Sequence, residues 1–118
     1  MSKHKSDTGK PPISLVPTQI IWEIAKVRDY GVNVKYPETG RDGWRQISID
    51  RIRDAMLRHC LRYIDDPQGL DEESGLPHLS HLACNIAFLC EMEQKPKKNV
   101  TVISAEGKGY VFSDDQKL

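Results

Sequence analysis

The sequence predicts a mainly α-helical fold, a three-helix bundle followed by a small C-terminal β-hairpin. Three segments carry apolar residues at helical spacing, and stretches that contain glycine and proline separate them. Two short runs near the C-terminus are rich in β-branched and aromatic residues instead. The chain has 118 residues, which suits a single core, since domains most often contain about 100–150 residues. The three predicted helices would therefore have to pack on one another.

The first predicted helix spans roughly residues 18–30. Thr18 can cap its start, and Gly31 stands where a helix would end. Its apolar residues fall largely on one side and are Ile20, Ile21, Ile24, Ala25 and Val27. Residues 1–12 before it are polar, contain glycine and proline and have no period, so we expect a disordered arm there.

The second predicted helix spans roughly residues 49–65 and opens after Ser48. It follows a loop that contains Pro37, Gly40 and Gly43, which we expect Tyr36 and Trp44 to anchor. On a helical wheel one arc holds Ile49, Ile52, Met56, Cys60 and Tyr63, whereas Arg51, Asp54 and Arg58 point the other way.

The third predicted helix has Pro77 at its first position and runs to about Glu93. We expect five of its residues to face inward: Leu79, Leu82, Ile86, Leu89 and Cys90. Beyond it, residues 100–103 and 110–112 flank "AEGKG" and resemble a hairpin. The chain thus divides into an arm over residues 1–12, a helical domain over 13–95 that would hold the site, and a hairpin with a tail over 96–118.

Charge and composition exclude several classes of protein. Seventeen Lys and Arg balance seventeen Asp and Glu, so no long-range field favours duplex nucleic acid, and a small ligand is the easier partner to defend. No apolar run of about 18 residues and no signal-peptide pattern occurs, which predicts an intracellular, soluble protein without a membrane partner. The three cysteines lack Cys-x-x-Cys spacing, so we expect buried free thiols.

The stretch "DEESGLPHLSH", residues 71–81, contains three carboxylates and two histidines within eleven positions. On the wheel of the third helix His78, His81 and Asn85 form a polar stripe beside the core. His59 of the second helix points toward the same interior edge. Three histidines therefore converge between two predicted helices, although a single histidine of this kind is more often a hydrogen-bonded structural residue.

The acidic residues of this stretch allow two interpretations. Asp71, Glu72 and Glu73 precede a helix, whose positive N-terminal end is sufficient reason for their presence. They could equally bind Mg²⁺, which prefers oxygen ligands and bridges to substrate phosphates. Glu23 is a further candidate ligand, and solvent exposure explains it equally well.

Basic and aromatic residues complete a possible nucleotide site. A guanidinium or ammonium group can clamp phosphates, and the candidates are Lys35, Arg41, Arg45, Arg53, Arg58 and Arg62. Each could also be an ordinary solvated surface charge. Tyr36 and Trp44 could stack on a base, or they could only plug their own loop. The sequence has neither a Walker loop nor a Gly-x-Gly-x-x-Gly motif.

Several of these stretches resemble a known family. "KPPISLVPTQIIWEIAKVRDYG", then Trp44 in a loop, then "RDAMLRHCLRY" and "GLDEESGLPHLSHLACNIAFL" are similar to small phage and prophage proteins that form the N-terminal domain of dATP/dGTP diphosphohydrolase. That family is commonly grouped with the MazG-like, all-α nucleoside triphosphate pyrophosphohydrolases. The resemblance covers roughly residues 10–92, and the family's recurrent residues fall here on Glu23, Tyr30, Gly31, Trp44, Asp54, Arg58, His59, Asp71, Glu73, Ser74, Gly75, His78, His81 and Asn85.

The resemblance implies a MazG-like helical fold and cleavage of a purine deoxynucleoside triphosphate to monophosphate and pyrophosphate, by water activated on Mg²⁺. The hypothesis assigns the chemistry to His59, His78 and His81, with Arg58 stabilising developing charge. The residues assigned to the nucleotide are Tyr30, Lys35, Trp44 and Asn85, and those assigned to the metal ion are Glu23, Asp71 and Glu73.

Two rival interpretations stay open. The Glu-x-x-Glu and Glu-x-x-Asp helix pairs of MazG enzymes are absent, which favours a protein that binds a nucleotide without hydrolysing it and so sequesters a host signalling nucleotide. Alternatively, the histidines hydrogen-bond within the core and the hairpin docks a partner chain. In the leading interpretation a shallow three-helix site predicts a homodimer or larger homo-oligomer, located in the cytoplasm, that of the host if a phage encodes the protein.

Overall fold

The computed structural model describes residues 9–94, 99–103 and 109–113. The chain divides into two compact units, one of residues 17–94 and one that combines residues 1–16 with residues 95–118. Most of the expected N-terminal arm, and the tail from residue 114, lie outside the described residues. His59, His78 and His81 all belong to the unit of residues 17–94, which is the helical one.

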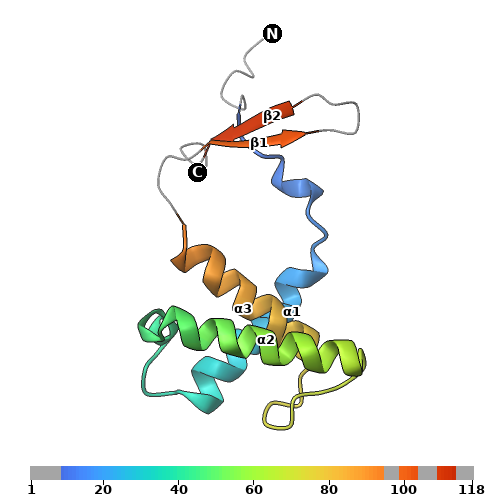
Figure 1. Cartoon of the computed structure of the whole chain (residues 1–118). Helices are drawn as coiled ribbons and strands as arrows, with labels where there is room; N and C mark the ends of the chain where they lie inside the picture. Colours follow the sequence, from blue (N-terminus) through green and yellow to red (C-terminus); the bar gives the residue numbers. More distant parts are fainter. Residues whose placement is uncertain (1–8, 95–98, 104–108, 114–118) are drawn as a thin grey trace. The chain divides into compact units, whose positions relative to one another are not determined.

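Three helices form the larger unit: α1 (Gln19–Tyr30), α2 (Ile49–Asp65) and α3 (His78–Met92). Both α1 and α2 pack against α3, as Figure 1 shows. The mainly helical fold and the three helices predicted from periodicity are confirmed. No helix in the described part of the chain is long and apolar enough to cross a membrane.

The two ends of α1 differ from the prediction. Thr18 makes no side-chain capping hydrogen bond, because its own backbone is already helical (φ −84°, ψ −14°) rather than extended as in most N-cap residues. At the other end Gly31 does not stop the chain from coiling. The backbone continues from α1 into one π-helical segment, η3 (Gly31–Lys35), which carries Lys35 toward the loop before α3.

Helix α2 begins as the sequence predicts. The Ser48 hydroxyl accepts a hydrogen bond from the backbone N–H of Arg51 (3.3 Å), and Ile52 is 3% exposed. A 3₁₀ turn, η4 (Gly43–Gln46), precedes the helix and positions Trp44. The indole of Trp44 stacks on Phe88 of α3, with ring centres 4.2 Å apart, so the loop between α1 and α2 is anchored to the third helix.

Helix α3 is rotated relative to the prediction from its hydrophobic pattern. Leu79, Ile86 and Cys90 are exposed, and the buried residues of the helix are His78, Ser80 and Cys84. The expectation that all three cysteines are buried is therefore confirmed for Cys84 and wrong for Cys90, while Cys60 is half-buried. The rotation has a physical cause, because the polar groups find partners inside: His78 bonds to His59, and the Ser80 hydroxyl donates to Glu23 at 2.7 Å.

The second unit contains a short 3₁₀ turn, η2 (Ile13–Leu15), and two strands, β1 (Asn99–Ile103) and β2 (Gly109–Ser113). The strands pair antiparallel, with Val100 opposite Phe112. The residues that connect them, 104–108, lie outside the described residues.

Candidate functional site

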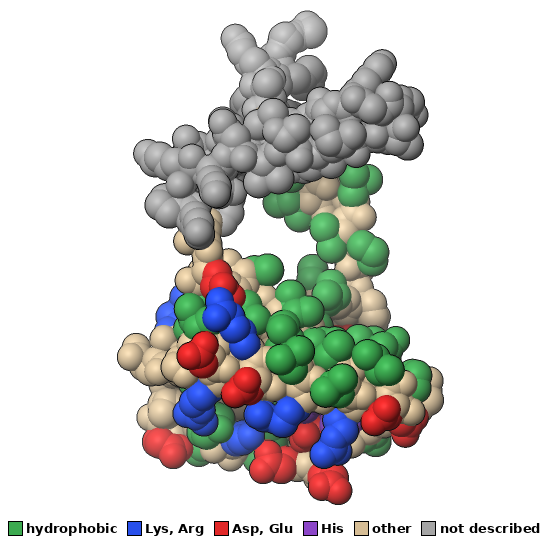
Figure 2. All heavy atoms as spheres, in the orientation of Figure 1, with side chains coloured by type: hydrophobic (Ala, Val, Ile, Leu, Met, Phe, Trp, Pro, Cys, Tyr) green, Lys and Arg blue, Asp and Glu red, His purple; other side chains and the backbone are tan. Residues whose placement is uncertain are grey.

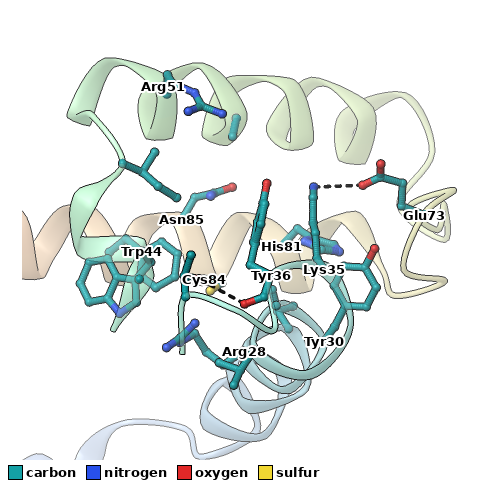
Figure 3. Close-up of a pocket in the computed structure, with 18 of the residues that line it drawn as sticks. Arg28, Tyr30, Lys35, Tyr36, Trp44, Arg51, Glu73, His81, Cys84 and Asn85 are labelled. Carbon is teal, nitrogen blue, oxygen red and sulfur yellow. Dashed lines mark hydrogen bonds and ion pairs between the residues drawn. The ribbon is translucent and has the colours of Figure 1, made fainter. Parts of the chain in front are cut away.

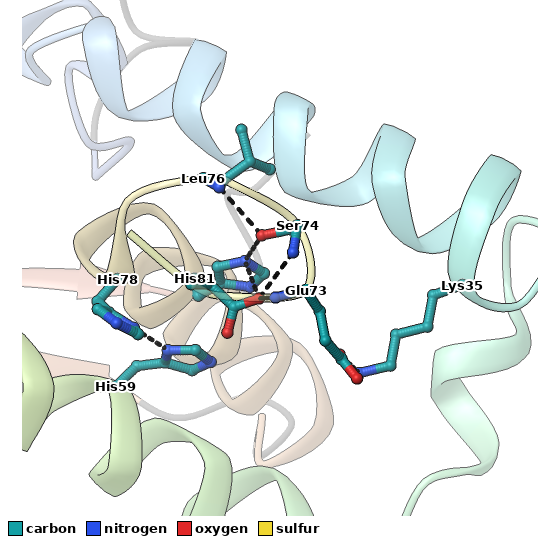
Figure 4. Close-up of polar contacts among 8 residues, drawn as sticks. Lys35, His59, Glu73, Ser74, Leu76, His78 and His81 are labelled. Carbon is teal, nitrogen blue, oxygen red and sulfur yellow. Dashed lines mark hydrogen bonds and ion pairs between the residues drawn. The ribbon is translucent and has the colours of Figure 1, made fainter. Parts of the chain in front are cut away.

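Three imidazoles meet between α2 and α3, as the helical wheel predicted. The Nδ1 atoms of His59 and His78 lie 2.9 Å apart, and the ring of His59 stacks on that of His81 with centres 4.6 Å apart and planes 10° from parallel. Figure 4 shows the three rings grouped beside the loop that precedes α3. The predicted convergence is therefore confirmed.

Asp71 shapes this loop through its backbone and its side chain. Its carboxylate Oδ2 accepts backbone N–H groups from Glu73 (3.1 Å) and Ser74 (2.9 Å), and its own N–H donates to the carbonyl of Leu76 (2.8 Å). Gly75 adopts a left-handed conformation, φ +73°, which favours glycine. The tight turn holds Asp71 Oδ2 3.9 Å from Nε2 of His81.

Two further contacts tie the loop to the histidines. The Ser74 hydroxyl accepts the N–H of Leu76 and shares a 2.7 Å hydrogen bond with Nε2 of His81. Gly69 accepts the N–H of His78 at 3.1 Å, and a Cβ at Gly69 would lie only 3.3 Å from Cδ2 of that ring. A side chain at position 69 would therefore push against His78.

Burial controls the protonation of the cluster. Partial burial and, to a smaller extent, the neighbouring His81 lower the pKa of His59 from 6.5 to about 4. Burial also lowers the pKa of His81, against the opposing charge of Asp71. Burial would raise the pKa of Asp71, but the N–H of Ser74 and the proximity of His81 lower it overall. At neutral pH His59 and His81 are thus uncharged beside an ionised carboxylate.

A cavity of about 350 Å³ opens next to the cluster (Figure 3). Segments from α1 to α3 line it, and its walls include Tyr30, Tyr36, Trp44, Asn85 and Phe88. The stack on Phe88 covers one face of Trp44, and the guanidinium of Arg45 lies over the same ring at 4.5 Å. Both faces of the indole are thus occupied, so Trp44 acts as a wall and Tyr36 is the freer aromatic ring.

Asn85 is a polar residue in the wall of this cavity. Its Oδ1 is buried and has no hydrogen-bond partner among the described residues. A buried amide oxygen without a partner loses roughly 1–3 kcal/mol relative to a bonded one. Since few such atoms persist in folded proteins, Asn85 is a ready acceptor for a ligand N–H.

A second cavity of about 270 Å³ adjoins the first and is more highly charged. The two share Lys35, His59, Asp71 and Glu73 in their walls. Arg58, Arg62, Glu72 and His78 complete the second cavity. The Lys35 Nζ lies 3.0 Å from the Glu73 carboxylate, and although burial would lower the pKa of Lys35, this bond raises it.

All but one of the residues assigned from the sequence line one of the two cavities. They are Tyr30, Lys35, Trp44, Arg58, His59, Asp71, Glu73, His78, His81 and Asn85. Glu23 lines neither cavity. Its carboxylate instead accepts hydrogen bonds from Ser80 (2.7 Å), Gln19 (2.7 Å) and Lys26 (3.3 Å).

Sequence reasoning missed several residues of the first cavity, among them Arg28, Arg51 and Phe88. Phe88 continues the stripe of His81 and Asn85 at the same spacing, so the wheel could have identified it. The two arginines carried no comparable signal. Arg28 reaches the site because its guanidinium donates to the carbonyl of Arg41 and lies 5.4 Å from the ring centre of Phe88.

One group in the described part of the chain has donor atoms close enough to share a metal ion. It consists of His59, Asp71 and His78, whose ligand atoms lie within 4.8 Å of one another. This set offers two imidazole nitrogens and one carboxylate oxygen. The Mg²⁺ that the resemblance implies prefers oxygen ligands alone, so the cluster does not suit a resident Mg²⁺ ion.

Comparison with known proteins identifies the family of this chain. The chain belongs to the family described as dATP/dGTP diphosphohydrolase, N-terminal, whose model matches residues 1–101. It is 36% identical over 89 residues to a protein of Salmonella phage PMBT28 named dATP/dGTP diphosphohydrolase, across 75% of this chain and 29% of the phage protein. The chain thus spans less than a third of that relative's length. No solved structure gives a significant match.

Proposed function

We propose that this chain binds a purine deoxynucleoside triphosphate in its two adjoining cavities and hydrolyses it to the monophosphate and pyrophosphate. One observation carries the proposal: a cavity with aromatic walls and an unpaired amide oxygen shares lining residues with a second cavity, which is lined by Lys35, Arg58 and Arg62. The first suits a base, and the second suits phosphates. Membership of the diphosphohydrolase family supports the same class of ligand.

The base would lie in the cavity of Tyr36 and Asn85. A purine presents N–H groups that the unpartnered Oδ1 of Asn85 could accept, while the amide nitrogen could donate to a ring nitrogen. Tyr30 and Tyr36 supply aromatic surface in the same cavity. Stacking on an aromatic ring is worth roughly 1–3 kcal/mol per base.

The phosphates would bind to the cations of the second cavity. The guanidinium groups of Arg58 and Arg62 can each form paired hydrogen bonds with phosphate oxygens. Lys35 would exchange its ion pair with Glu73 for a phosphate. This pair is exposed and therefore contributes little stability by itself, so breaking it costs little free energy.

Hydrolysis would follow from attack of water on the α-phosphorus. The new P–O bond forms as the bond to the bridging oxygen breaks, and pyrophosphate leaves. A neutral imidazole of the cluster would accept the proton of water, and Arg58 would stabilise the developing negative charge. With its pKa near 4 His59 is a weak base, so His81 is the better acceptor of the two.

Mg²⁺ enters this proposal with the substrate. Glu23 is engaged by Ser80, Glu73 by Lys35, and Asp71 by two backbone N–H groups. These three carboxylates do not form one oxygen-only group among the described residues. We therefore assign Mg²⁺ to the metal–nucleotide complex that a triphosphate normally forms, and no step of the hydrolysis is assigned to a resident Mg²⁺.

The direct test is release of pyrophosphate from each of the four dNTPs with Mg²⁺ present. Turnover should favour dATP or dGTP, and Arg58→Ala should abolish most of it. Arg53→Ala is the matched control on the same helix, because Arg53 pairs with Glu93 (2.6 Å) and lines neither cavity. Absence of turnover with every dNTP would remove the hydrolytic part of the proposal.

A second candidate function is binding without hydrolysis. It is favoured because the imidazole cluster has a single carboxylate, Asp71, within reach among the described residues. Such a protein would sequester a host signalling nucleotide. Calorimetric binding of a cyclic or ADP-ribose-type nucleotide that is recovered intact after denaturation would distinguish it from the enzyme.

We also propose that the chain forms homodimers or larger homo-oligomers in the host cytoplasm, where nucleotides are abundant. Leu57, Leu61 and Ile64 lie along one side of α2 and are 53%, 62% and 64% exposed. Figure 2 shows hydrophobic side chains gathered on this side of the helical unit. Light scattering of the purified protein and of Leu61→Lys measures the mass; a monomer for the unaltered chain would contradict the proposal.

A further inference from the structure

We propose that His59, Asp71 and His78 form a binding site for a divalent transition metal ion of the Zn²⁺ type. The ligands would be Nδ1 of each histidine and one carboxylate oxygen of Asp71. The inference goes beyond the proposed function, because it concerns a resident ion, and it holds whether or not the chain cleaves a nucleotide. Three observations support it: the distance between the two histidine nitrogens, the chemistry of the donor atoms, and the cavity that the three residues line.

The distance between the two nitrogens matches that between ligands of one ion. Nδ1 of His59 and Nδ1 of His78 are 2.9 Å apart. Two imidazole nitrogens at the usual Zn–N distance of about 2.0–2.1 Å are separated by about 2.9 Å at a right angle and about 3.3 Å at the tetrahedral angle. The two nitrogens could therefore bind one ion with shifts of a few tenths of an ångström. The ligand atoms of all three residues lie within 4.8 Å of one another, so the carboxylate of Asp71 would move closer to the nitrogens on binding.

The loop before α3 holds the third ligand in position. Two backbone N–H groups bind Oδ2 of Asp71 and restrict its rotation. The third imidazole, His81, stacks on His59 and lies 3.9 Å from the same carboxylate. Groups of this kind around a metal site orient the ligands, and their loss typically lowers affinity about 10–100-fold.

The donor set selects the class of ion. Imidazole nitrogen suits Zn²⁺, Co²⁺, Ni²⁺ and related ions, whereas Mg²⁺ and Ca²⁺ favour oxygen. Three protein ligands leave coordination positions open, as in catalytic rather than structural zinc sites. His59, Asp71 and His78 all line the second cavity, together with Arg58 and Arg62. The open positions would thus face the cavity proposed for phosphates, where an anion could complete the coordination.

The rival explanation is that the two imidazoles merely share a proton. One Nδ1 would donate to the other, and that hydrogen bond would account for the 2.9 Å separation without an ion. The two explanations differ in what happens when metal is added to the protein, since only the first predicts stoichiometric binding with nitrogen ligands.

The test uses the full chain, free of affinity tags, treated with chelator and titrated calorimetrically with Zn²⁺ and separately with Mg²⁺. No nucleotide is present, so failure here is distinguishable from failure of the proposed function. We expect one Zn²⁺ per chain and no measurable Mg²⁺ binding. His78→Gln and Asp71→Asn should each weaken Zn²⁺ binding at least about tenfold. The amide of Asp71→Asn can still accept the two backbone N–H groups, so that variant retains the turn.

Glu73→Gln is the matched control. It removes a carboxylate two positions from Asp71 that is bound to Lys35, and it should change the Zn²⁺ affinity by less than about twofold. Equal Zn²⁺ affinity in all four proteins, or none in any of them, would overturn the proposal. Loss of binding in Glu73→Gln with retention in His78→Gln would also overturn it and would point to a carboxylate site.

X-ray absorption of the Zn²⁺-loaded unaltered protein needs no substitution and covers the case of a variant that does not fold. We expect two imidazole nitrogens at about 2.0–2.1 Å and a light oxygen shell. The free thiols of Cys60, Cys84 and Cys90 are the competing ligands. Sulfur at about 2.3 Å, or oxygen alone, would show that the ion binds elsewhere.

Discussion

The stability of this protein should fall as pH is lowered from 7.5 to 5, and His59 should cause a measurable share of the loss. Burial lowers the pKa of His59 from 6.5 to about 4 in the folded chain. Between these two values the unfolded chain binds a proton that the folded chain does not. The contribution is therefore fully present above about pH 6.5 and is lost as pH falls toward 4.

The size of the effect follows from the shift. One pKa unit corresponds to about 1.4 kcal/mol, so a fully buried ring with these pKa values would lose about 2 kcal/mol between pH 7.5 and pH 5. His59 is only half-buried, and solvent screening reduces the figure to about 1 kcal/mol. The lowered pKa of His81 acts in the same direction. Hence His59→Gln should reduce the dependence on pH without removing it.

Urea unfolding followed by circular dichroism at pH 7.5, 6 and 5 provides the free energies, with chelator present to exclude metal ions. The quantity of interest is the loss of stability between pH 7.5 and pH 5 in the unaltered protein minus that in His59→Gln. Titration of distant carboxylates cancels in this difference. A difference of about 1 kcal/mol is expected. If both proteins lose the same free energy, the argument from burial of His59 is wrong.

Five further substitutions probe the fold and the cavity. Ile52→Ala should lower the unfolding free energy by about 2–5 kcal/mol because Ile52 is 3% exposed, whereas Leu57→Ala, at a site 53% exposed, should change it by less than about 1 kcal/mol in chemical denaturation. Ser48→Ala should cost about 1 kcal/mol through loss of the α2 cap, and wild-type stability would contradict this. Gly75→Ala should lower the unfolding free energy by about 1–2 kcal/mol, because the residue has a φ of +73° that alanine adopts only with strain. A steric clash does not contribute, since an added Cβ would meet no atom within 4 Å. Asn85→Ala should weaken purine nucleotide binding about tenfold in calorimetry; unchanged affinity would exclude Asn85 from base recognition.

Local signals account for the parts of the fold that were predictable. Helix α2 was placed at its observed bounds because Ser48 is a capping residue and Ile52 marks a periodic apolar side, and both depend on residues a few positions apart. The convergence of His59, His78 and His81 followed from the same spacing. It needed only the assumption that α2 and α3 are neighbours.

The rest of the site depended on partners distant in the sequence. The pattern of α3 predicted Leu79 and Ile86 inside, but both are exposed. Nothing near Ser80 in the sequence indicates that the carboxylate of Glu23, fifty-seven positions earlier, would accept its hydroxyl. Because of that contact, the carboxylate of Glu23 is engaged away from the histidines and is no longer a candidate metal ligand.

The sequence by itself determined the three helices and the presence of histidines on facing helices, because both follow from helical spacing. Only the tertiary structure decided which side of α3 is buried and which donors approach within reach of one ion. The physical reason is that a buried polar group is stable only with a partner. The partners of His78 and Ser80 come from other helices, so their positions are set when the helices pack.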